Sequence, residues 1–279
     1  MTDKLKAYTK NPLSLFLMLI VMLSALLTFG VLIYIIAYIL VKGLPYLTLS
    51  LFALKYTTEN VSMLPAIINT VIMVVCSLAI AMPFGIFTAI YLVEYAKKGN
   101  KAVDLIRLTS ETLAGIPSII YGLFGLLFFV TYLGMGFSIL AGAFTLSIMI
   151  LPLIMRTTEE SLISVPDSYR EASYGLGAGK LRTVFRIVIP AAIPGILAGI
   201  ILSIGRIVGE TAALIYTAGT VADLPENLLS SGRTLSVHMY ALSSEGLYTN
   251  QAYATAVVLL ILVLFINTLS AFIARRLTK

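Results

Sequence analysis

Long uninterrupted runs of apolar residues dominate the chain, and short polar segments separate them. The runs do not alternate between apolar and polar positions as lipid-facing β-strands do. They reach the length of about 20 residues that a helix needs to cross a bilayer, where the backbone must satisfy its own hydrogen bonds. Six runs qualify, at approximately Leu13–Val41, Ala66–Val93, Leu113–Leu133, Phe137–Met155, Pro190–Tyr216 and Ala252–Ala274.

These runs predict an all-α integral membrane protein with six transmembrane helices. A short segment, residues 1–12, precedes a transmembrane domain at 13–279, in which the connection 156–189 is the most substantial polar segment. Of the 279 residues, 59% are hydrophobic and 11% are charged, whereas a soluble domain carries about a quarter charged residues. The first run is too long for a signal peptide and lacks a small-residue cleavage site, so it is expected to be a true span.

The lysines and arginines are divided unequally between two sets of connecting segments. Of 19, fifteen lie in the N-terminal segment, the second and fourth connections and the C-terminal segment. Three lie in the other connections and one lies inside a span. Because positive charge collects in cytoplasmic segments, both termini are predicted to be cytoplasmic. The net charge of +6 therefore reflects membrane topology and not nucleic-acid binding.

Two residues with reactive side chains stand alone. Cys76 lies in an apolar run, cannot form an internal disulfide and is expected to pack as a small apolar side chain. His238 lies in the outer connection 217–250, and with no second histidine in the chain it predicts no metal site. The stretch LSVHMYAL around it is typical of a short strand or an interfacial helix. No nucleophile and base stand together, so the chain is not expected to be an enzyme.

The segment EASYGLGAGKLRTVFRIVIP, Glu171–Pro190, contains glycines and a lysine of the kind found in phosphate-binding loops. Its spacing excludes them. The G-x-x-x-x-G-K-[ST] motif requires Ser or Thr where Leu181 follows Lys180, and Gly where Tyr174 stands. The dinucleotide motif G-x-G-x-x-G fails as well. We therefore expect no nucleotide site and no bound cofactor in this chain.

A helix, a turn and a second helix fit this segment better. Ser168 and Glu171 have the spacing of a capping box, and Gly177 and Gly179 permit the left-handed conformations of a sharp turn. The second helix has an apolar face formed by Leu181, Val184, Phe185 and Val188. Two interpretations fit: an amphipathic helix among lipid head groups, or a docking surface for a cytoplasmic partner.

The segment also resembles the signature loop of ABC importer permeases, which reads E-A-A, three residues, G, nine residues, I-x-L-P. Ser173 replaces the second alanine and Ile189 replaces the leucine. The resemblance implies the fold of type I ABC importer permeases, in which this loop forms a coupling helix that inserts into a separate ATPase. ATP-driven closure then moves the spans as rigid bodies. The matching residues are Glu171, Ala172, Ser173, Gly177, Ile187 and Pro190.

Two charges lie inside the fifth run, in GRIVGETAALIYTAG at Gly205–Gly219. Arg206 and Glu210 are one helical turn apart, so they are expected to face the same side past the bilayer midplane, where each charge costs at least about 2.5 kcal/mol. They form either a self-neutralising pair that joins helices or a path for an oxyanion, whose oxygens match the guanidinium fork. The path is favoured, with Glu210 limiting how tightly the anion is held. Glu111 is interpreted as an acid at a helix start.

Three segments resemble the PstA family of phosphate ABC transporter permeases: Leu113–Gly125, Gly205–Gly219 and Arg233–Gly246. With the signature loop, the resemblance covers about residues 60 to 275. It implies that Arg206 and Glu210 are transport residues. It also implies a bacterial or archaeal inner membrane and several partners: a PstC-like permease in a heterodimer, two PstB-like ATPases that carry ATP and Mg²⁺, and a PstS-like phosphate-binding protein.

Two alternatives remain open from the residues. A permease for another oxyanion, such as sulfate or molybdate, would use the same arginine. An ion-coupled secondary carrier would use Arg206 and Glu210 as a proton relay, although the inverted repeats common in that class are not evident. A membrane scaffold that transports nothing gives no reason to bury two charges.

Overall fold

The computed structural model describes residues 12–97 and 99–277, and the regular elements in this part of the chain are all helices. The expected N-terminal segment, residues 1–12, lies outside the described residues except for Pro12, as do Lys98 and Lys279. The α-helices are α2 (Pro12–Gly43), α3 (Leu64–Ile90), α4 (Lys101–Ala114), α5 (Ser118–Gly125), α6 (Ile139–Ile163), α7 (Asp167–Gly175), α8 (Lys180–Thr183), α9 (Ile189–Gly209), α10 (Ala212–Ile215), α11 (Leu235–Glu245) and α12 (Thr249–Leu277).

Three π-helical stretches continue these helices without a break. The stretch η3 (Tyr91–Tyr95) extends α3, η4 (Leu126–Tyr132) extends α5, and η5 (Val184–Val188) joins α8 to α9. Two short 3₁₀ turns, η1 (Leu44–Tyr46) and η2 (Leu49–Phe52), follow α2.

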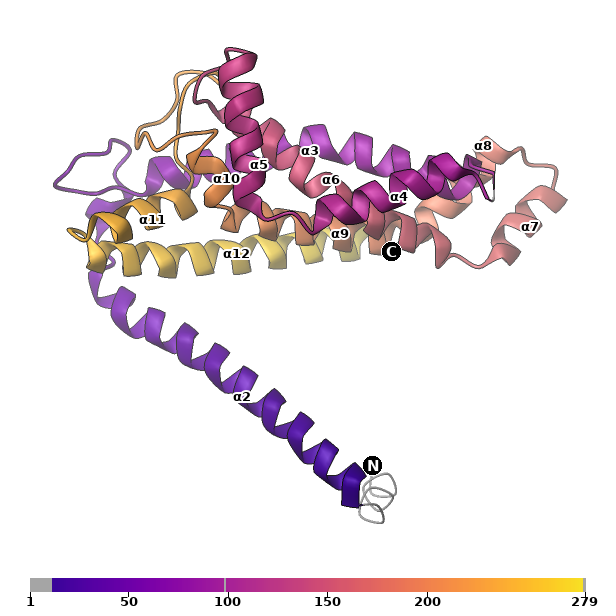
Figure 1. Cartoon of the computed structure of the whole chain (residues 1–279), viewed down its shortest axis with the longest axis horizontal. Coiled ribbons are helices and arrows are strands. Elements are labelled where there is room, and N and C mark those ends of the chain that lie inside the picture. Colours follow the sequence, from indigo (N-terminus) through magenta and orange to yellow (C-terminus); the bar gives the residue numbers. More distant parts are fainter. Residues whose placement is uncertain (1–11, 98, 278–279) are drawn as a thin grey trace.

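Helices α3, α6, α9 and α12 run side by side along the long axis of the molecule (Figure 1). Helix α6 packs against both α3 and α9, and α9 packs against α12. Helices α7 and α8 lie at one end of this bundle and α11 lies at the other (Figure 1). The main apolar core therefore lies around α6, with Leu146, Ile150 and Ile154 fully buried in it.

The predicted all-α membrane fold is confirmed, with a correction to the third span. Among the described residues, five helices are long and apolar enough to cross a bilayer, and α4 with α5–η4 makes a sixth crossing if this bent pair is one span. The sequence predicts a single helix at 113–133, but the chain bends by 101° between Ala114 and Ser118. Pro117 explains the bend, because a proline disfavours the helical conformation of the residue before it.

Two other boundaries differ from the prediction. Helix α6 does not end at Met155 but continues to Ile163, so the expected loop 156–189 begins inside a helix. Its charged last turns remain helical because their apolar side packs into the protein, with Leu162 fully buried, while Arg156 and Glu160, four residues apart, pair at 3.0 Å on the exposed side. Beyond α7 the chain is one helix from Lys180 to Gly209 and not a separate ramp before the fifth span.

The predicted capping box before α7 is wrong. Helix α7 starts at Asp167 with Pro166 as its N-cap and no side-chain cap, so Ser168 lies inside the first turn. Proline fixes φ near −65° and sets this start without a capping side chain. The turn after α7 does contain a left-handed residue, Gly177 with φ of +81°, whereas Gly179 has φ of −75°.

Helices α6 and α9 approach closely where small residues meet. Gly195 and Gly199 of α9 face Ser161 and Thr157 of α6, so both contacts repeat every four residues. A Cβ on Gly195 would lie 2.9 Å from the Cβ of Ser161, and one on Gly199 would lie 2.6 Å from the Cβ of Thr157. Such small-residue contacts let the backbones of membrane helices approach closely.

The outer connection contains helix α11, which decides between the strand and the helix that its sequence permits. His238 of this helix is fully buried, and its ring meets that of Tyr56 edge-on with centroids 6.3 Å apart. Burial, and to a smaller extent the positive charge of Arg233, lower the pKa of His238 from 6.5 to about 3. This histidine is therefore neutral in the folded protein at physiological pH.

Acid is expected to destabilise the protein through His238. The unfolded chain takes up this proton near pH 6.5 and the folded chain only near pH 3, so the free energy of unfolding falls as the pH falls through that window. At about pH 5 the loss is about 2 kcal/mol. Thermal unfolding at about pH 7.5 and about pH 5 tests this. His238→Gln should remove this part of the pH dependence, and an unchanged dependence would contradict it.

Candidate functional site

A cavity of about 660 Å³ lies between α4, α6 and α9. Its wall combines apolar residues with six charged ones, three basic and three acidic. Helix α4 contributes two, α6 contributes three and α9 contributes one; they are Arg107, Glu111, Arg156, Glu159, Glu160 and Arg206. The structure thus gathers into one site charges that are up to a hundred residues apart in the sequence.

Two of the three guanidinium groups in this cavity are already paired. Arg107 on α4 binds Glu159 on α6, with its Nη2 2.5 Å from Oε1. Arg156 binds Glu160 as described above. Among the described residues, Arg206 forms no ion pair within 4.0 Å. Its fork of N–H donors is therefore the one that an anion in the cavity meets without displacing a carboxylate.

Arg206 occupies a different setting from the one that its sequence position predicts. Helices α6 and α9 are antiparallel, and Arg206 lies seven residues, or about 10 Å, beyond their contact at Gly199 and Thr157. It nevertheless shares its cavity with Arg107 and Arg156, which the charge distribution places toward the cytoplasm. The guanidinium thus faces a cavity that leads toward the predicted cytoplasmic side and is not isolated in the outer half.

Glu210 lies just outside the helix that carries Arg206, whereas the prediction placed both residues on one helix. Helix α9 ends at Gly209, and Glu210 has an extended backbone with φ of −73° and ψ of 129°. Its carboxylate accepts a hydrogen bond from the backbone N–H of Ala213 at 3.1 Å, and Ser236 donates to its carbonyl oxygen at 2.6 Å. The side chain therefore stabilises the turn into α10. The self-neutralising pair, which was the alternative to a path, is not formed within 4.0 Å among the described residues.

The interpretation of Glu111 also changes. It lies in the last turn of α4 and not at the start of that helix. Instead it lines the charged cavity with Arg206. The amphipathic pattern of α4 indicates that one side of this helix packs against another helix. Only the fold shows that this other helix is α6.

A second hollow lies at the signature loop, between α7 and the helix that begins at α8. It has a volume of about 510 Å³. Leu176 at its rim is 89% exposed. Four of the predicted docking residues line this groove: Ala172, Ser173, Gly177 and Ile187. Glu171 and Pro190 are exposed beside it.

One hydrogen bond joins the two sides of this groove. The hydroxyl groups of Ser173 on α7 and Thr183 on α8 lie 2.8 Å apart. Ser173 stands where the family signature has alanine, so here the departure from the signature links α7 to the start of the α8–α9 helix.

The family model for the inner membrane component of binding-protein-dependent transport systems matches residues 81–279. This match covers well over half of the chain. The chain belongs to this family.

Individual relatives agree with this assignment. The probable ABC transporter permease protein YqgI of Bacillus subtilis is 32% identical over 92% of this chain and 93% of its own length. The phosphate transport system permease protein PstA of Yersinia pestis is 33% identical over 95% of this chain and 90% of its own length. A chain of the bacterial alginate ABC transporter crystal structure has the same fold, with a TM-score of 0.70, 18% identity and 98% coverage of both chains.

The permease is therefore a multi-pass inner membrane protein with the type I ABC importer fold that its sequence predicts. Its family implies assembly with another permease subunit, with ATPases and with a substrate-binding protein. ATP hydrolysis belongs to a separate subunit in such transporters.

Proposed function

We propose that this permease carries inorganic phosphate in an ATP-driven importer. The observation that carries the proposal is the unpaired guanidinium of Arg206 in a cavity of about 660 Å³. Arginine presents a planar fork of donors that matches two oxygens of a tetrahedral anion. Relatives named as phosphate transport permeases support phosphate as that anion.

The charges around Arg206 suit the passage of an anion better than its tight binding. Glu111, Glu159 and Glu160 lie in the same cavity wall, so an anion bound at Arg206 also meets negative charge nearby. An anion has to be attracted strongly enough to enter and weakly enough to leave. The unpaired Arg206 attracts the anion. Arg107 and Arg156 are already paired with glutamates, so they do not hold the anion tightly and it can leave.

Coupling to ATP is assigned to the exposed groove between α7 and α8. The loop that forms this groove has an apolar rim and two basic residues, Arg182 and Arg186, which suit its insertion into a cleft of a PstB-like ATPase. Two copies of this ATPase bind ATP and Mg²⁺. A PstC-like permease completes the translocation path, and a PstS-like protein delivers phosphate to the outer connections. In this arrangement both termini are cytoplasmic, and this chain binds no cofactor of its own.

Reconstitution of the assembled complex in proteoliposomes tests the proposal. With the binding protein outside and ATP available to the ATPase, labelled phosphate is expected to accumulate, and a non-hydrolysable ATP analogue is expected to stop it. Excess sulfate or molybdate should not compete. Uptake of sulfate or molybdate in place of phosphate would identify another oxyanion permease, and uptake that an ion gradient alone sustains would identify a secondary carrier.

A further inference from the structure

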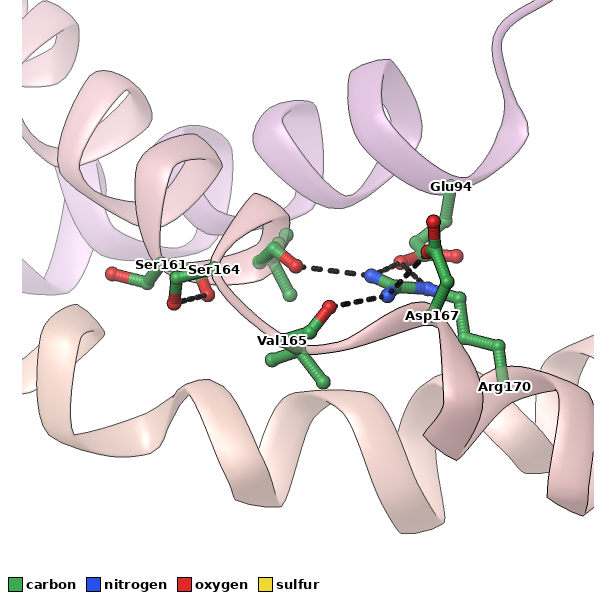
Figure 2. A network of polar contacts seen from close by, with 7 residues as sticks. Glu94, Ser161, Ser164, Val165, Asp167 and Arg170 are labelled. Atoms are coloured by element: carbon green, nitrogen blue, oxygen red, sulfur yellow. Dashed lines mark hydrogen bonds and ion pairs between the residues drawn. The ribbon is translucent and has the colours of Figure 1, made fainter.

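Arg170, the residue just before the signature loop, forms hydrogen bonds to three separate parts of the chain (Figure 2). Its Nε and Nη2 donate to Oε1 of Glu94, at 3.1 and 2.7 Å. Nη2 also donates to the carbonyl of Leu162 at 3.0 Å, and Nη1 donates to that of Val165 at 2.8 Å. A fifth bond joins Nη1 to Asp167 at 3.2 Å.

Apart from Asp167 of α7 itself, these partners lie at the ends of helices that span the membrane. Glu94 lies in η3 at the end of α3, while Leu162 lies in the last turn of α6 and Val165 follows it. The carbonyls at a helix C-terminus lack partners within the helix, and a cation there is favoured by the helix dipole. Arg170 thus binds the ends of α3 and α6 at the same time.

The contact is buried, unlike most ion pairs at a protein surface. The side chains of Arg170 and Glu94 are 14% and 5% exposed, whereas that of Asp167 is 88% exposed. An apolar cluster that includes Leu92, Leu162 and Val165 lies beside them. A buried charge that loses its partner is strongly destabilising, whereas an exposed pair contributes little.

Helix α7 has little else to fix it to α3 and α6. None of its residues is buried. Its contacts with α8 and η5, including the bond between Ser173 and Thr183, attach it to the α8–α9 helix instead. The chain itself joins α7 to α6 through residues 164–166. Arg170 adds the side-chain contacts that hold α7 against the ends of α3 and α6.

We propose that Arg170 is a positioning residue, which with Glu94 transmits movement of α7 to α3 and α6. Helix α6 carries Arg156, Glu159 and Glu160 of the charged cavity. Displacement of α7 by the ATPase would thus move the cavity wall opposite Arg206. We call the contacts of Arg170 with Glu94, Leu162 and Val165 the clamp. The consequence for transport rests on the proposed function, but the clamp itself is a property of the chain alone.

Four variants separate positioning from folding. Arg170→Met removes all five hydrogen bonds, and Glu94→Gln removes the charge but keeps the shape. The double variant Arg170→Met/Glu94→Met leaves no unpaired buried charge, so it is expected to fold even if a single variant does not. Asp167→Asn is the matched control, because it changes only the exposed contact of the same arginine.

Hydrogen exchange on the purified full chain tests the clamp without any transport. The backbone amides of 167–175 are expected to exchange at least about tenfold faster in the double variant. They should change less than about twofold in Asp167→Asn, and those of α12 should not change in either. Wild-type exchange across 167–175 in the double variant would overturn the clamp.

Phosphate uptake per ATP hydrolysed, measured in the reconstituted complex, tests transmission. The double variant is expected to retain its ATPase partners and to hydrolyse ATP, while this ratio falls at least about tenfold. Glu94→Gln should lower it less, and Asp167→Asn should leave it unchanged. An unchanged ratio in the double variant would overturn the proposal. If the wild-type complex itself takes up no phosphate, the proposed function fails, while the exchange experiment still decides the clamp.

Discussion

Replacing Arg206 with glutamine is expected to reduce phosphate uptake by the assembled complex at least about 100-fold. Glutamine keeps polar atoms at the site but loses the charge and the fork of donors. Hydrogen bonds to charged groups contribute about 1.5–3 kcal/mol each, so the loss of two accounts for a reduction of this size. The initial rate of labelled phosphate uptake into proteoliposomes measures the effect.

Two further variants define what this result means. Arg206→Lys keeps the charge without the planar fork, so we expect uptake between those of the glutamine variant and the wild type. Lys55→Gln, which changes an exposed cation in the connection between α2 and α3, should leave uptake unchanged. Co-purification of the ATPase subunits shows whether each complex is assembled. If an assembled Arg206→Gln complex transports phosphate normally, Arg206 is not on the path.

The second large effect is expected at the contact between α6 and α9. In Gly199→Leu the new side chain overlaps Thr157 of α6, which lies where its Cβ must be placed. Thr157 cannot turn away freely, because its hydroxyl already donates to the carbonyl of Leu153 at 2.8 Å. Overpacking of a tight contact costs about 1–3 kcal/mol or more. A lower thermal unfolding temperature and a smaller yield of folded protein measure this loss.

Gly205→Leu is the matched control on the same helix. No atom lies within 4 Å of the position that a Cβ on Gly205 would occupy. Leucine there also removes the conformational cost of glycine in a helix, about 1 kcal/mol. This variant should therefore be as stable as the wild type or more stable. Equal losses of stability in Gly199→Leu and Gly205→Leu would show that the close approach of the two helices is not what the glycine preserves.

The sequence predicts the spanning helices well because the bilayer imposes a simple requirement. Lipid offers no hydrogen bonds to the backbone, so an apolar run of sufficient length must be helical. For the same reason, the charge of Arg206 inside an apolar run could be identified as unusual before its neighbours were known.

The partners of Arg206 could not be predicted, because they depend on how three helices pack. A helix continued through Glu210 would place this side chain one turn above Arg206. The chain instead turns into α10, where Ala213 packs against Gly122 of α5 so closely that a Cβ on the glycine would lie 2.8 Å from the Cα of Ala213. The end of α9 thus allows α10 to contact α5, a segment some ninety residues away in the sequence. No local pattern contains that information.

The length of α6 was predicted too short for a similar reason, because its last turns are charged. Arg156 and Glu160 look like the end of a span when hydropathy is read along the chain. In the structure they lie on the exposed side of α6, while Leu162 on its other side remains fully buried. The direction in which each side chain points decides whether a charge ends a helix, and hydropathy averaged over a window does not record it.

Helix α2 diverges from the rest of the molecule (Figure 1), and its most apolar stretch is not buried at all. It meets α12 near its C-terminal end, where Gly43 lies against the backbone of Tyr253 and the ring of Tyr38 meets that of Tyr253. The ribosome makes α2 more than two hundred residues before Tyr253. During synthesis α2 is therefore made without the contact to this chain that holds it in the structure, and the surface that provides this contact is among the last to be made.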